Sequence, residues 1–492
     1  MGIHQESSKV RLGESLAYSD SLKEQSILKS IDVLLMYRDI AKLESANKVI
    51  CVGTSAVREA KNNKYFIDQV LRKTGLKVRV LSGEEEAYYS YLGASMSTCI
   101  PNGLFFDLGG GSLEVVYTED FKVKKVQAFP LGALRLTRTF ANQDGSFSKK
   151  DCDNMSQTIL DTLPSKKSYG IGIDSLLVGI GGTLRALGRY DQKRAAYPFE
   201  KIHNYRLTLS TIDSLRKDLS YLKTDVISSL LPLDSTRVET IVAGTHVIHS
   251  IMKKFDFEEL VISGYGLREG ILASFIQDPN TLQNHSIESL EKQILKILSY
   301  HCYKHDISGF GLDDMMHDMI YYKLLKEREV EILSYALYTL SGLPETNKHY
   351  SLFYHILDED YPRLTYREQV ILALSIVYSK KIRTGEELFY KYNHLLKPQN
   401  LKSIQKIAIL VKLARIIIKT RSQIRIKLTE NEKMIFTIIP THKSFPNILL
   451  KQIIQKVSTI FDIPVQYNLP NKIDTIKHST ATDKIISIKS QT

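Results

Sequence analysis

The chain has 492 residues, 43% hydrophobic and 24% charged, which is enough for about three domains of roughly 100–200 residues each. Its net charge of +12 suits an acidic partner such as a polyphosphate or a nucleotide, or reflects a lysine-rich proteome, and no dense basic run indicates a nucleic-acid partner. No apolar segment is long and uncharged enough to span a bilayer, and the N-terminus has no signal core, so we expect a cytoplasmic protein that does not bind a membrane.

The cysteines give no sign of a metal site or of a disulfide framework. Cys51, Cys99, Cys152 and Cys302 form no CxxC pair, which argues against a zinc ribbon. This spacing fits a reducing compartment.

Short β-rich runs alternate with helical patterns from residue 48 to 280, and this alternation predicts an α/β fold. Four strand-like runs are each followed by a helical pattern, at 48–75, 77–97, 175–190 and 259–276. Strand–strand hairpins are mixed in at 105–117 and 123–132, so a purely parallel, doubly wound sheet is not expected.

The C-terminal part has a different pattern. Residues 277–287 are polar and rich in turn formers, which indicates a linker. Apolar residues at helical spacing then continue to about residue 422, and 423–468 reads as strands followed by another helix. The last 20 or so residues are polar and are expected to fray.

The stretch FFDLGGGSLEVVY at 105–117 is the first candidate site. Three successive glycines, Gly109, Gly110 and Gly111, let the chain approach a ligand closely and point several N–H groups at an anion. The following SLEVVY alternates like a strand, whereas a Walker A loop and a Rossmann turn both open a helix. The pattern therefore predicts a hairpin whose tip holds phosphate.

Carboxylates flank this hairpin tip. Asp107 lies just before the glycines, and Glu114 lies two residues beyond Ser112. Carboxylates beside a phosphate suggest Mg²⁺ between them, because hard cations take oxygen ligands. The alternative is a structural glycine-rich hairpin with a capping aspartate.

A second glycine turn occurs in LLVGIGGTLRALG at 176–188. Gly179, Gly181 and Gly182 end a buried strand, and Thr183 opens a helix whose free N–H groups can bind an anion. Many strand-to-helix turns use glycine, so an ordinary turn is the alternative.

The acidic stretch LSGEEEAYYSYLG at 81–93 supplies a candidate base. Ser82 and Glu85 have capping-box spacing, and Glu84 favours the helix dipole. Glu86 needs neither explanation, so it could deprotonate an attacking water. The alternative is that all three acids are solvated at a helix N-terminus.

The block VGTSAVREAKN at 52–62 adds a cation. Thr54 and Ser55 are plausible helix caps after a strand, and Arg58 lies one turn into the helix. An arginine there could grip phosphate with two nitrogens, or could be an ordinary surface residue.

Taken in order, these pieces resemble one family, the exopolyphosphatases and guanosine pentaphosphate phosphohydrolases of the actin-like ATPase fold. The resemblance covers about residues 9 to 275, and seven blocks in the right order are more specific than any one alone. The matching blocks lie at 9–16, 52–62, 81–93, 105–116, 131–137, 179–188 and 264–272.

The resemblance implies three domains and a set of roles. A first RNase H-like lobe would occupy 1–98, a second lobe with the phosphate turns 99–280, and a mostly α-helical HD-like domain 281–492. It implies Glu86 as the catalytic residue and Mg²⁺ held by Asp107 and Glu114. It also implies a phosphate-binding set: Arg58, Gly109, Gly110, Gly111, Ser112, Gly181, Gly182 and Thr183.

Two departures from the family pattern stand out. The family normally has a strand, a DIGSNS-like phosphate hairpin and another strand before the block that starts here at Lys9. Either the reading frame is longer, or half of the phosphate clamp is missing. The HD-type metal pair would lie near 333–343, which has no His or Asp, while His349 and the adjacent His317 and Asp318 do not replace it.

The expected activity is hydrolysis of the terminal phosphoanhydride of polyphosphate or guanosine pentaphosphate, with release of orthophosphate and with homodimers possible. A kinase or ATPase of the same fold is a rival that would need an adenosine pocket. A non-enzymatic binder of guanosine tetraphosphate or polyphosphate is the other alternative. The C-terminal domain is then expected to be a structural or polyphosphate-guiding module without metal.

Overall fold

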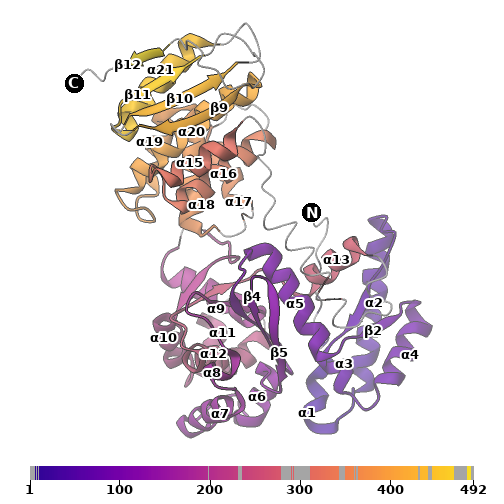
Figure 1. Cartoon of the computed structure of the whole chain (residues 1–492). Helices are drawn as coiled ribbons and strands as arrows, with labels where there is room; N and C mark the ends of the chain where they lie inside the picture. The colour runs from indigo at the N-terminus through magenta and orange to yellow at the C-terminus, as the bar shows by residue number, and fades with distance from the viewer. Residues whose placement is uncertain are drawn as a thin grey trace. The chain divides into compact units, whose positions relative to one another are not determined.

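The structure of the protein is a computed structural model, drawn whole in Figure 1. It describes residues 6, 8, 10, 12–197, 199–230, 235–278, 290, 292, 311–342, 349–359, 361, 364–429, 433–440, 446–469 and 485–488. The chain divides into two units, Met1–Cys302 (unit 1) and Tyr303–Thr492 (unit 2). Most of the predicted linker at 277–287, with the predicted boundary after residue 280, lies outside the described residues.

The first lobe of unit 1 contains a two-stranded parallel sheet of β1 (Cys51–Gly53) and β2 (Val78–Val80). Helix α4 (Asn63–Thr74) ends at Gly75, whose φ of +74° closes the helix in a left-handed conformation that glycine adopts without strain. The other helices are η1 (Leu12–Ser15), α1 (Leu16–Ser19), α2 (Glu24–Leu43) and α3 (Ser55–Glu59). Their apolar side chains form one core with Leu22, Ile27, Ile31, Val57, Phe66 and Val70.

The second lobe is built on a six-stranded mixed sheet in the order β5-β4-β3-β6-β8-β7. The central pairs β3–β6 and β6–β8 are parallel, whereas β3–β4, β4–β5 and β7–β8 are antiparallel, so the expectation of a sheet with hairpins is confirmed. The strands are β3 (Gly103–Leu108), β4 (Leu113–Glu119), β5 (Lys122–Phe129), β6 (Leu176–Ile180), β7 (Arg206–Thr208) and β8 (Glu259–Ile262).

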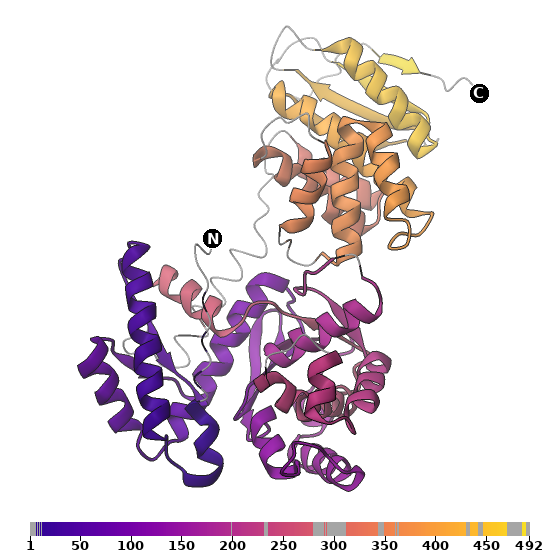
Figure 2. The ribbon, with the colours of Figure 1, turned by 180° about the vertical axis from the view of Figure 1, so that it is seen from behind.

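Helices cover both faces of this sheet, as the views in Figures 1 and 2 illustrate. Successive residues of β3 and β4 therefore enter two different cores: Phe106 and Val115 join one, while Phe105 and Val116 join the other. The helices are α6 (Ala133–Phe140), α7 (Lys149–Thr162), α8 (Lys166–Tyr169), α9 (Gly182–Arg194), α10 (Leu209–Leu219), α11 (Thr224–Leu230), α12 (Ser235–Phe255) and α13 (Leu267–Gln277).

Helix α5 (Gly83–Thr98) joins the lobes and is buried along most of its length. It packs on β4, β5 and α13. A Cβ atom on Gly270 would lie 1.9 Å from the Tyr89 carbonyl oxygen, and one on Gly93 would lie 2.0 Å from the Gly266 oxygen. Glycine at both positions lets the backbones of α5 and α13 touch.

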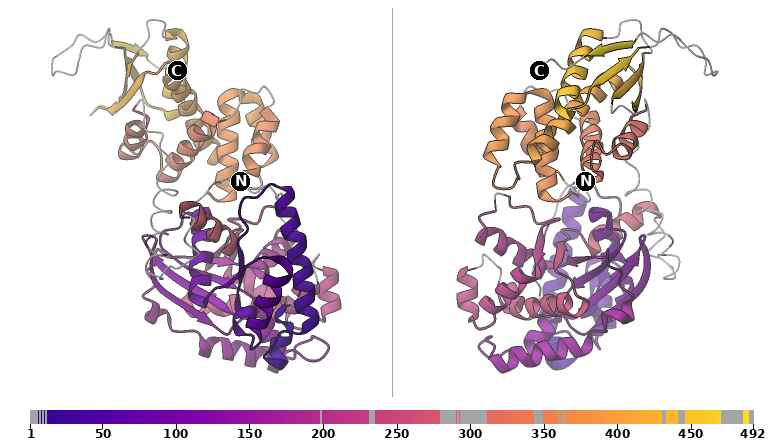
Figure 3. Two further views of the ribbon diagram at one scale, coloured as in Figure 1. Left: turned by 90° about the vertical axis from the view of Figure 1, so that its right-hand side faces the viewer. Right: turned by 60° about the vertical axis from the view of Figure 1, so that its left-hand side comes forward.

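Unit 2 combines helices with a second sheet (Figure 3). Strands predicted after residue 422, and the helix after them, are confirmed, and β12 falls within the segment that was expected to fray. The sheet order is β12-β11-β10-β9. The elements are α15 (Leu312–Tyr321), α16 (Glu327–Gly342), α17 (His349–Asp358), α18 (Tyr366–Lys380), α19 (Ile382–Lys391), α20 (Asn400–Lys419), β9 (Gln423–Leu428), β10 (Met434–Ile439), α21 (Asn447–Phe461), β11 (Val465–Asn468) and β12 (Ile485–Ile488).

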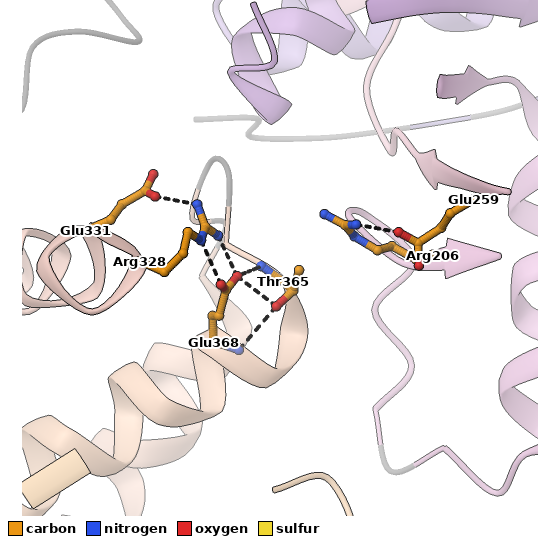
Figure 4. A network of polar contacts seen from close by, with 6 residues as sticks. All are labelled: Arg206, Glu259, Arg328, Glu331, Thr365 and Glu368. Atoms are coloured by element: carbon orange, nitrogen blue, oxygen red, sulfur yellow. Dashed lines mark hydrogen bonds and ion pairs between the residues drawn. The ribbon is translucent and has the colours of Figure 1, made fainter. Parts of the chain in front are cut away.

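An arginine ties two helices of unit 2 together. Arg328 of α16 donates through Nε and Nη2 to the two carboxylate oxygens of Glu368 on α18, at 2.8 and 2.6 Å, and also pairs with Glu331 (Figure 4). The same Glu368 completes the capping box with Thr365 at the start of α18. One carboxylate thus fixes both a helix start and a helix–helix contact.

The structure bears on the expectations for the cysteines and for membrane-spanning segments. Cys99 is disulfide-bonded, which the cysteine spacing does not indicate, while Cys51 and Cys152 are free thiols. Among the helices that the structure describes, none is long and apolar enough to cross a membrane.

Candidate functional site

A cavity of about 590 Å³ lies between the two lobes of unit 1. The first lobe contributes the start of α3 and the first turn of α5, and the second lobe contributes the β3–β4 hairpin tip and α6. Its lining consists of Gly13, Leu16, Asp20, Thr54, Ser55, Ala56, Glu59, Glu86, Gly109, Gly110, Gly111, Ser112, Leu134, Arg135, Arg138 and Thr139.

The glycine run forms the predicted hairpin tip between β3 and β4. The tip closes on itself because the Gly109 N–H donates to the Ser112 carbonyl at 3.1 Å. The first N–H groups of α6 donate to the carbonyls of Gly109 and Gly110, at 2.9–3.0 Å. The tip carbonyls are therefore occupied by α6, which satisfies the start of that helix.

The amides of the tip remain available to an anion. Among the described residues, no backbone carbonyl accepts from the N–H groups of Gly110, Gly111 or Ser112. A Cβ atom on Gly111 would lie 2.2 Å from the Ser55 hydroxyl oxygen, so no larger residue fits there without movement. These amides are therefore open at the hairpin tip, and the nest for an anion that the three glycines indicate stays a prediction.

Glu86 faces the same cavity from the start of α5. The capping box between Ser82 and Glu85 is present, with the Glu85 N–H 3.1 Å from the Ser82 hydroxyl and the Ser82 N–H 2.9 Å from Glu85 Oε2. Glu85 also pairs with Arg79. The next side chain, Glu86, is only 12% exposed and lines the cavity.

Arg58 contacts Glu86 and does not line the cavity. Its Nη1 donates to Glu86 Oε2 and to the Leu81 carbonyl, both at 2.9 Å. Burial raises the pKa of Glu86, the Arg58 hydrogen bond and charge oppose that rise, and the negative charges of Asp107 and Glu59 add to it. The structure thus places Arg58 as a partner of the carboxylate, and its predicted contact with phosphate stays a prediction.

Asp107 and Glu114 are register partners on β3 and β4, so their side chains lie on the same face of the sheet. Asp107 Oδ2 accepts a 2.6 Å hydrogen bond from Ser90. Glu114 is 3% exposed, and its Oε1 has no hydrogen-bond partner among the described residues. Burial, together with the charges of Glu86 and Asp107, raises the pKa of Glu114 to about 8 against an opposing hydrogen bond from Ser112.

These two carboxylates fit Mg²⁺ better than a metal that needs a full protein cage. Within the described ranges, no group of three or more His, Cys, Asp or Glu side chains is arranged to hold a metal ion. Mg²⁺ commonly takes one or two carboxylates and completes its shell with water and substrate phosphates. The unpartnered Oε1 of Glu114 is an oxygen that such an ion would satisfy.

The second glycine turn joins β6 to α9 beside Asp107. Gly181 has φ of +119°, and a Cβ atom on it would lie 2.8 Å from the Leu108 carbonyl and 3.4 Å from Asp107 Oδ1. The structure therefore brings this turn against the end of β3. Gly181, Gly182 and Thr183 are not among the residues that line the cavity.

Two arginines at this turn were missed by sequence reasoning. The Arg237 guanidinium lies over Gly182, where a Cβ atom would come within 1.9 Å of it, and Arg185 Nη1 is 3.3 Å from the Gly264 carbonyl. Burial and the positive charges of Arg237 and Arg268 lower the pKa of Arg185. Arg185 lies within the GGTLRAL block and could have been noticed, whereas Arg237 comes from the distant α12 without a local signal.

Glu86 and the glycine-rich hairpin tip thus line one cavity between two lobes built of strands and helices. Residues 1–278 match the Ppx/GppA phosphatase family, and the chain belongs to this family. The resemblance found in the sequence is therefore confirmed.

Individual relatives resemble the same half of the chain. A bifunctional 3-dehydroquinate synthase/phosphatase of Fusobacterium nucleatum is 28% identical over 270 residues, 53% of this chain and 40% of that protein. A guanosine-5'-triphosphate,3'-diphosphate pyrophosphatase of Pseudoalteromonas translucida is 26% identical over 275 residues, 55% of this chain and 53% of that protein. The chain thus spans about half or less of the length of these two relatives.

A solved structure supports the fold of unit 1. The crystal structure of an exopolyphosphatase from Cytophaga hutchinsonii covers 55% of this chain and 88% of its own, with 25% sequence identity and a TM-score of 0.52.

Proposed function

We propose that unit 1 hydrolyses the terminal phosphoanhydride bond of inorganic polyphosphate or of guanosine pentaphosphate and releases orthophosphate. The observation that carries this proposal is that Glu86 and the amides of the hairpin tip line one cavity. A general base within reach of an anion-binding nest is the minimum that attack of water on a bound phosphoryl group requires.

The residues divide the work as follows. The N–H groups of Gly110, Gly111 and Ser112 hold oxygens of the phosphoryl group under attack. Glu86 orients a water molecule and takes its proton at a carboxylate oxygen. In phosphoryl transfer such positioning and electrostatic stabilisation supply most of the catalysis.

Arg58 keeps Glu86 ready for this role. Burial alone favours the protonated carboxyl, which cannot accept a proton from water. The 2.9 Å hydrogen bond from Arg58 favours the ionised form and fixes which oxygen faces the cavity. We therefore assign Arg58 as a positioning residue.

Mg²⁺ is part of the proposal. Asp107 and Glu114 would hold it, and it would offset negative charge on the phosphate groups. The second glycine turn, at Gly181 to Thr183, would bind a further phosphate through its free helix N–H groups. The assignment of Mg²⁺ rests on the register pairing of Asp107 with Glu114 and on the unpartnered Glu114 Oε1. The assignment of the turn rests on its proximity to Asp107.

For unit 2 we propose an HD-like helical module without a metal centre. The segment at 333–343, whose described residues 333–342 belong to α16, carries no His or Asp at the place of the family's metal pair. The role proposed for this unit is structural or substrate-guiding, and the same family resemblance leaves a homodimer as the proposed assembly.

The test is orthophosphate release by the full chain from polyphosphate and from guanosine pentaphosphate, each with Mg²⁺ and with a chelator. Turnover of either substrate that disappears with the chelator is expected. Tight binding of guanosine tetraphosphate or polyphosphate without turnover would contradict the proposal and would identify a binding protein.

A further inference from the structure

Among the described residues that line the cavity, each carboxylate is paired with a cation. Glu86 pairs with Arg58 at 2.9 Å, and Asp20 pairs with Lys61 at 3.0 Å. Glu59 pairs with Arg135, with 2.5 Å between Oε2 and Nη2. The cations of these three pairs can therefore meet a phosphate chain only if the phosphate replaces the carboxylate.

The Glu59–Arg135 pair lies next to the hairpin tip, where a phosphate could replace Glu59 as the partner of Arg135. Arg135 lies on α6 of the second lobe, and its Nε donates to the Gly111 carbonyl at 2.8 Å, directly at the tip. Glu59 comes from α3 of the first lobe and also accepts a 3.2 Å hydrogen bond from Ser55. The pair thus joins the two lobes beside the nest.

This pair is accessible and weakly held. The side chains of Arg135 and Glu59 are 42% and 39% exposed, and ion pairs at such exposure contribute little to stability. A phosphate offers more negative charge than one carboxylate and suits the planar guanidinium fork. Exchange of Glu59 for phosphate therefore costs little.

Arg138 is a second cation on the side of α6 that lines the cavity. It lies three residues after Arg135 on the same helix and lines the same cavity, as does the neighbouring Thr139. Residues three apart on a helix are neighbours on its surface. Two guanidinium groups in sequence, starting at the nest, match a linear row of phosphates rather than a single one.

We propose that Arg135 and Arg138 form a distal phosphate subsite, and that Glu59 occupies Arg135 until a phosphate of the substrate replaces it. This inference rests on the proposed function and narrows its substrate to linear polyphosphate. Glu59 then acts as a competitor of the substrate for Arg135. Removing the negative charge of Glu59 should therefore strengthen polyphosphate binding. Loss of Arg135 should weaken polyphosphate binding, although both changes break the same ion pair.

The experiment measures equilibrium binding of long-chain polyphosphate and of tripolyphosphate by calorimetry. The full chain carries Glu86→Gln so that the ligand is not hydrolysed. Arg135→Gln is expected to weaken binding of the long chain about tenfold or more, as loss of a charge-assisted hydrogen bond does. Arg138→Gln should weaken long-chain binding more than tripolyphosphate binding. Glu59→Gln should tighten binding several-fold.

The matched control is Arg194→Gln, which removes a similarly exposed arginine, paired with Asp218 at 3.0 Å, that does not line the cavity. It should leave the dissociation constants within about twofold, since neither Arg194 nor its ionic partner Asp218 lines the cavity. A purely structural pair would make Arg135→Gln and Glu59→Gln shift binding in the same direction, and that result, or no shift in either, overturns the subsite.

The outcome separates this inference from the proposed function. Wild-type release of orthophosphate from polyphosphate, with unchanged binding in Arg135→Gln, overturns the subsite alone. Opposite shifts in the two variants without any wild-type turnover support the subsite and overturn the hydrolase. Absence of any polyphosphate binding overturns both.

Discussion

The contact between α5 and α13 gives a sharp prediction, because it positions the helix that carries Glu86. In Gly270→Ala the new methyl group would lie 1.9 Å from the Tyr89 carbonyl oxygen and 3.0 Å from the Gly93 nitrogen. Both obstacles are backbone atoms in a buried helix, so no side chain can rotate away. Relief to an ordinary contact of about 3.5 Å needs a helix shift of roughly 1.5 Å.

The expected cost follows from this geometry. Overpacking a well-packed core costs about 1–3 kcal/mol and occasionally more, and this case belongs at the upper end since the backbone must move. Displacement of Tyr89 also displaces Glu86, one turn earlier on α5. A misplacement of about 1 Å can lower a rate by about 100-fold. We expect Gly270→Ala to lower both the melting temperature of unit 1 and the rate of orthophosphate release.

The control is a glycine-to-alanine substitution at a position where the nearest atom belongs to a flexible side chain and not to the backbone. In Gly188→Ala the one contact under 3 Å is with the end of the Ile262 side chain, at 2.7 Å, while Ile202 and Tyr205 lie at ordinary distances of 3.5 and 3.6 Å. The helix gains up to about 1 kcal/mol of propensity. Thermal unfolding followed by circular dichroism compares the two variants. A Gly270→Ala protein as stable as Gly188→Ala would refute the reasoning from backbone contact.

Three further predictions concern single residues. Arg58→Gln should lower kcat by about 100-fold with little change in KM, because it misplaces Glu86, whereas Arg58 itself does not line the cavity. Steady-state kinetics measure both constants, and a rise in KM with kcat unchanged would contradict this prediction. Gly111→Ala should destabilise the protein, because the new methyl group would lie 2.2 Å from the Ser55 hydroxyl oxygen. Ser55→Ala should restore stability in the double variant, since the nearest atom is then the Cβ of residue 55 at 3.6 Å. A double-mutant cycle in denaturant that shows additive effects would rule the clash out. Burial lowers the pKa of His246 from 6.5 to about 4, so as the pH falls the unfolded chain takes up this proton before the folded chain does. The corresponding stabilisation of the fold, about 3 kcal/mol, is present above pH 6.5 and is lost as the pH falls towards 4. His246→Gln should flatten the dependence of the unfolding free energy on pH over that range, and an unchanged slope would contradict the assignment.

The local parts of the site could be predicted from the sequence. Three glycines before an alternating run specify the hairpin, because only a tight turn followed by a strand fits both patterns. The capping box of Ser82 and Glu85 fixes the start of α5, and so leaves Glu86 as the carboxylate with no structural task. These inferences work because the interacting residues are a few positions apart.

The contacts between distant segments could not be predicted in the same way. Arg58 donates to Glu86, 28 residues away on another helix, and Arg135 meets Glu59 across 76 residues. Neither pair has a periodicity that marks it.

The central claim is that Glu86 activates water beside a nest that binds phosphate. Its most direct test is orthophosphate release from polyphosphate by Glu86→Gln compared with Glu84→Gln, a neighbouring exposed acid in the same helical turn that does not line the cavity. The account predicts a loss of 10²–10⁴-fold in kcat, roughly the contribution of a general base, for Glu86→Gln with substrate binding retained. It predicts near wild-type turnover for Glu84→Gln. Equal activity of the two variants would contradict it.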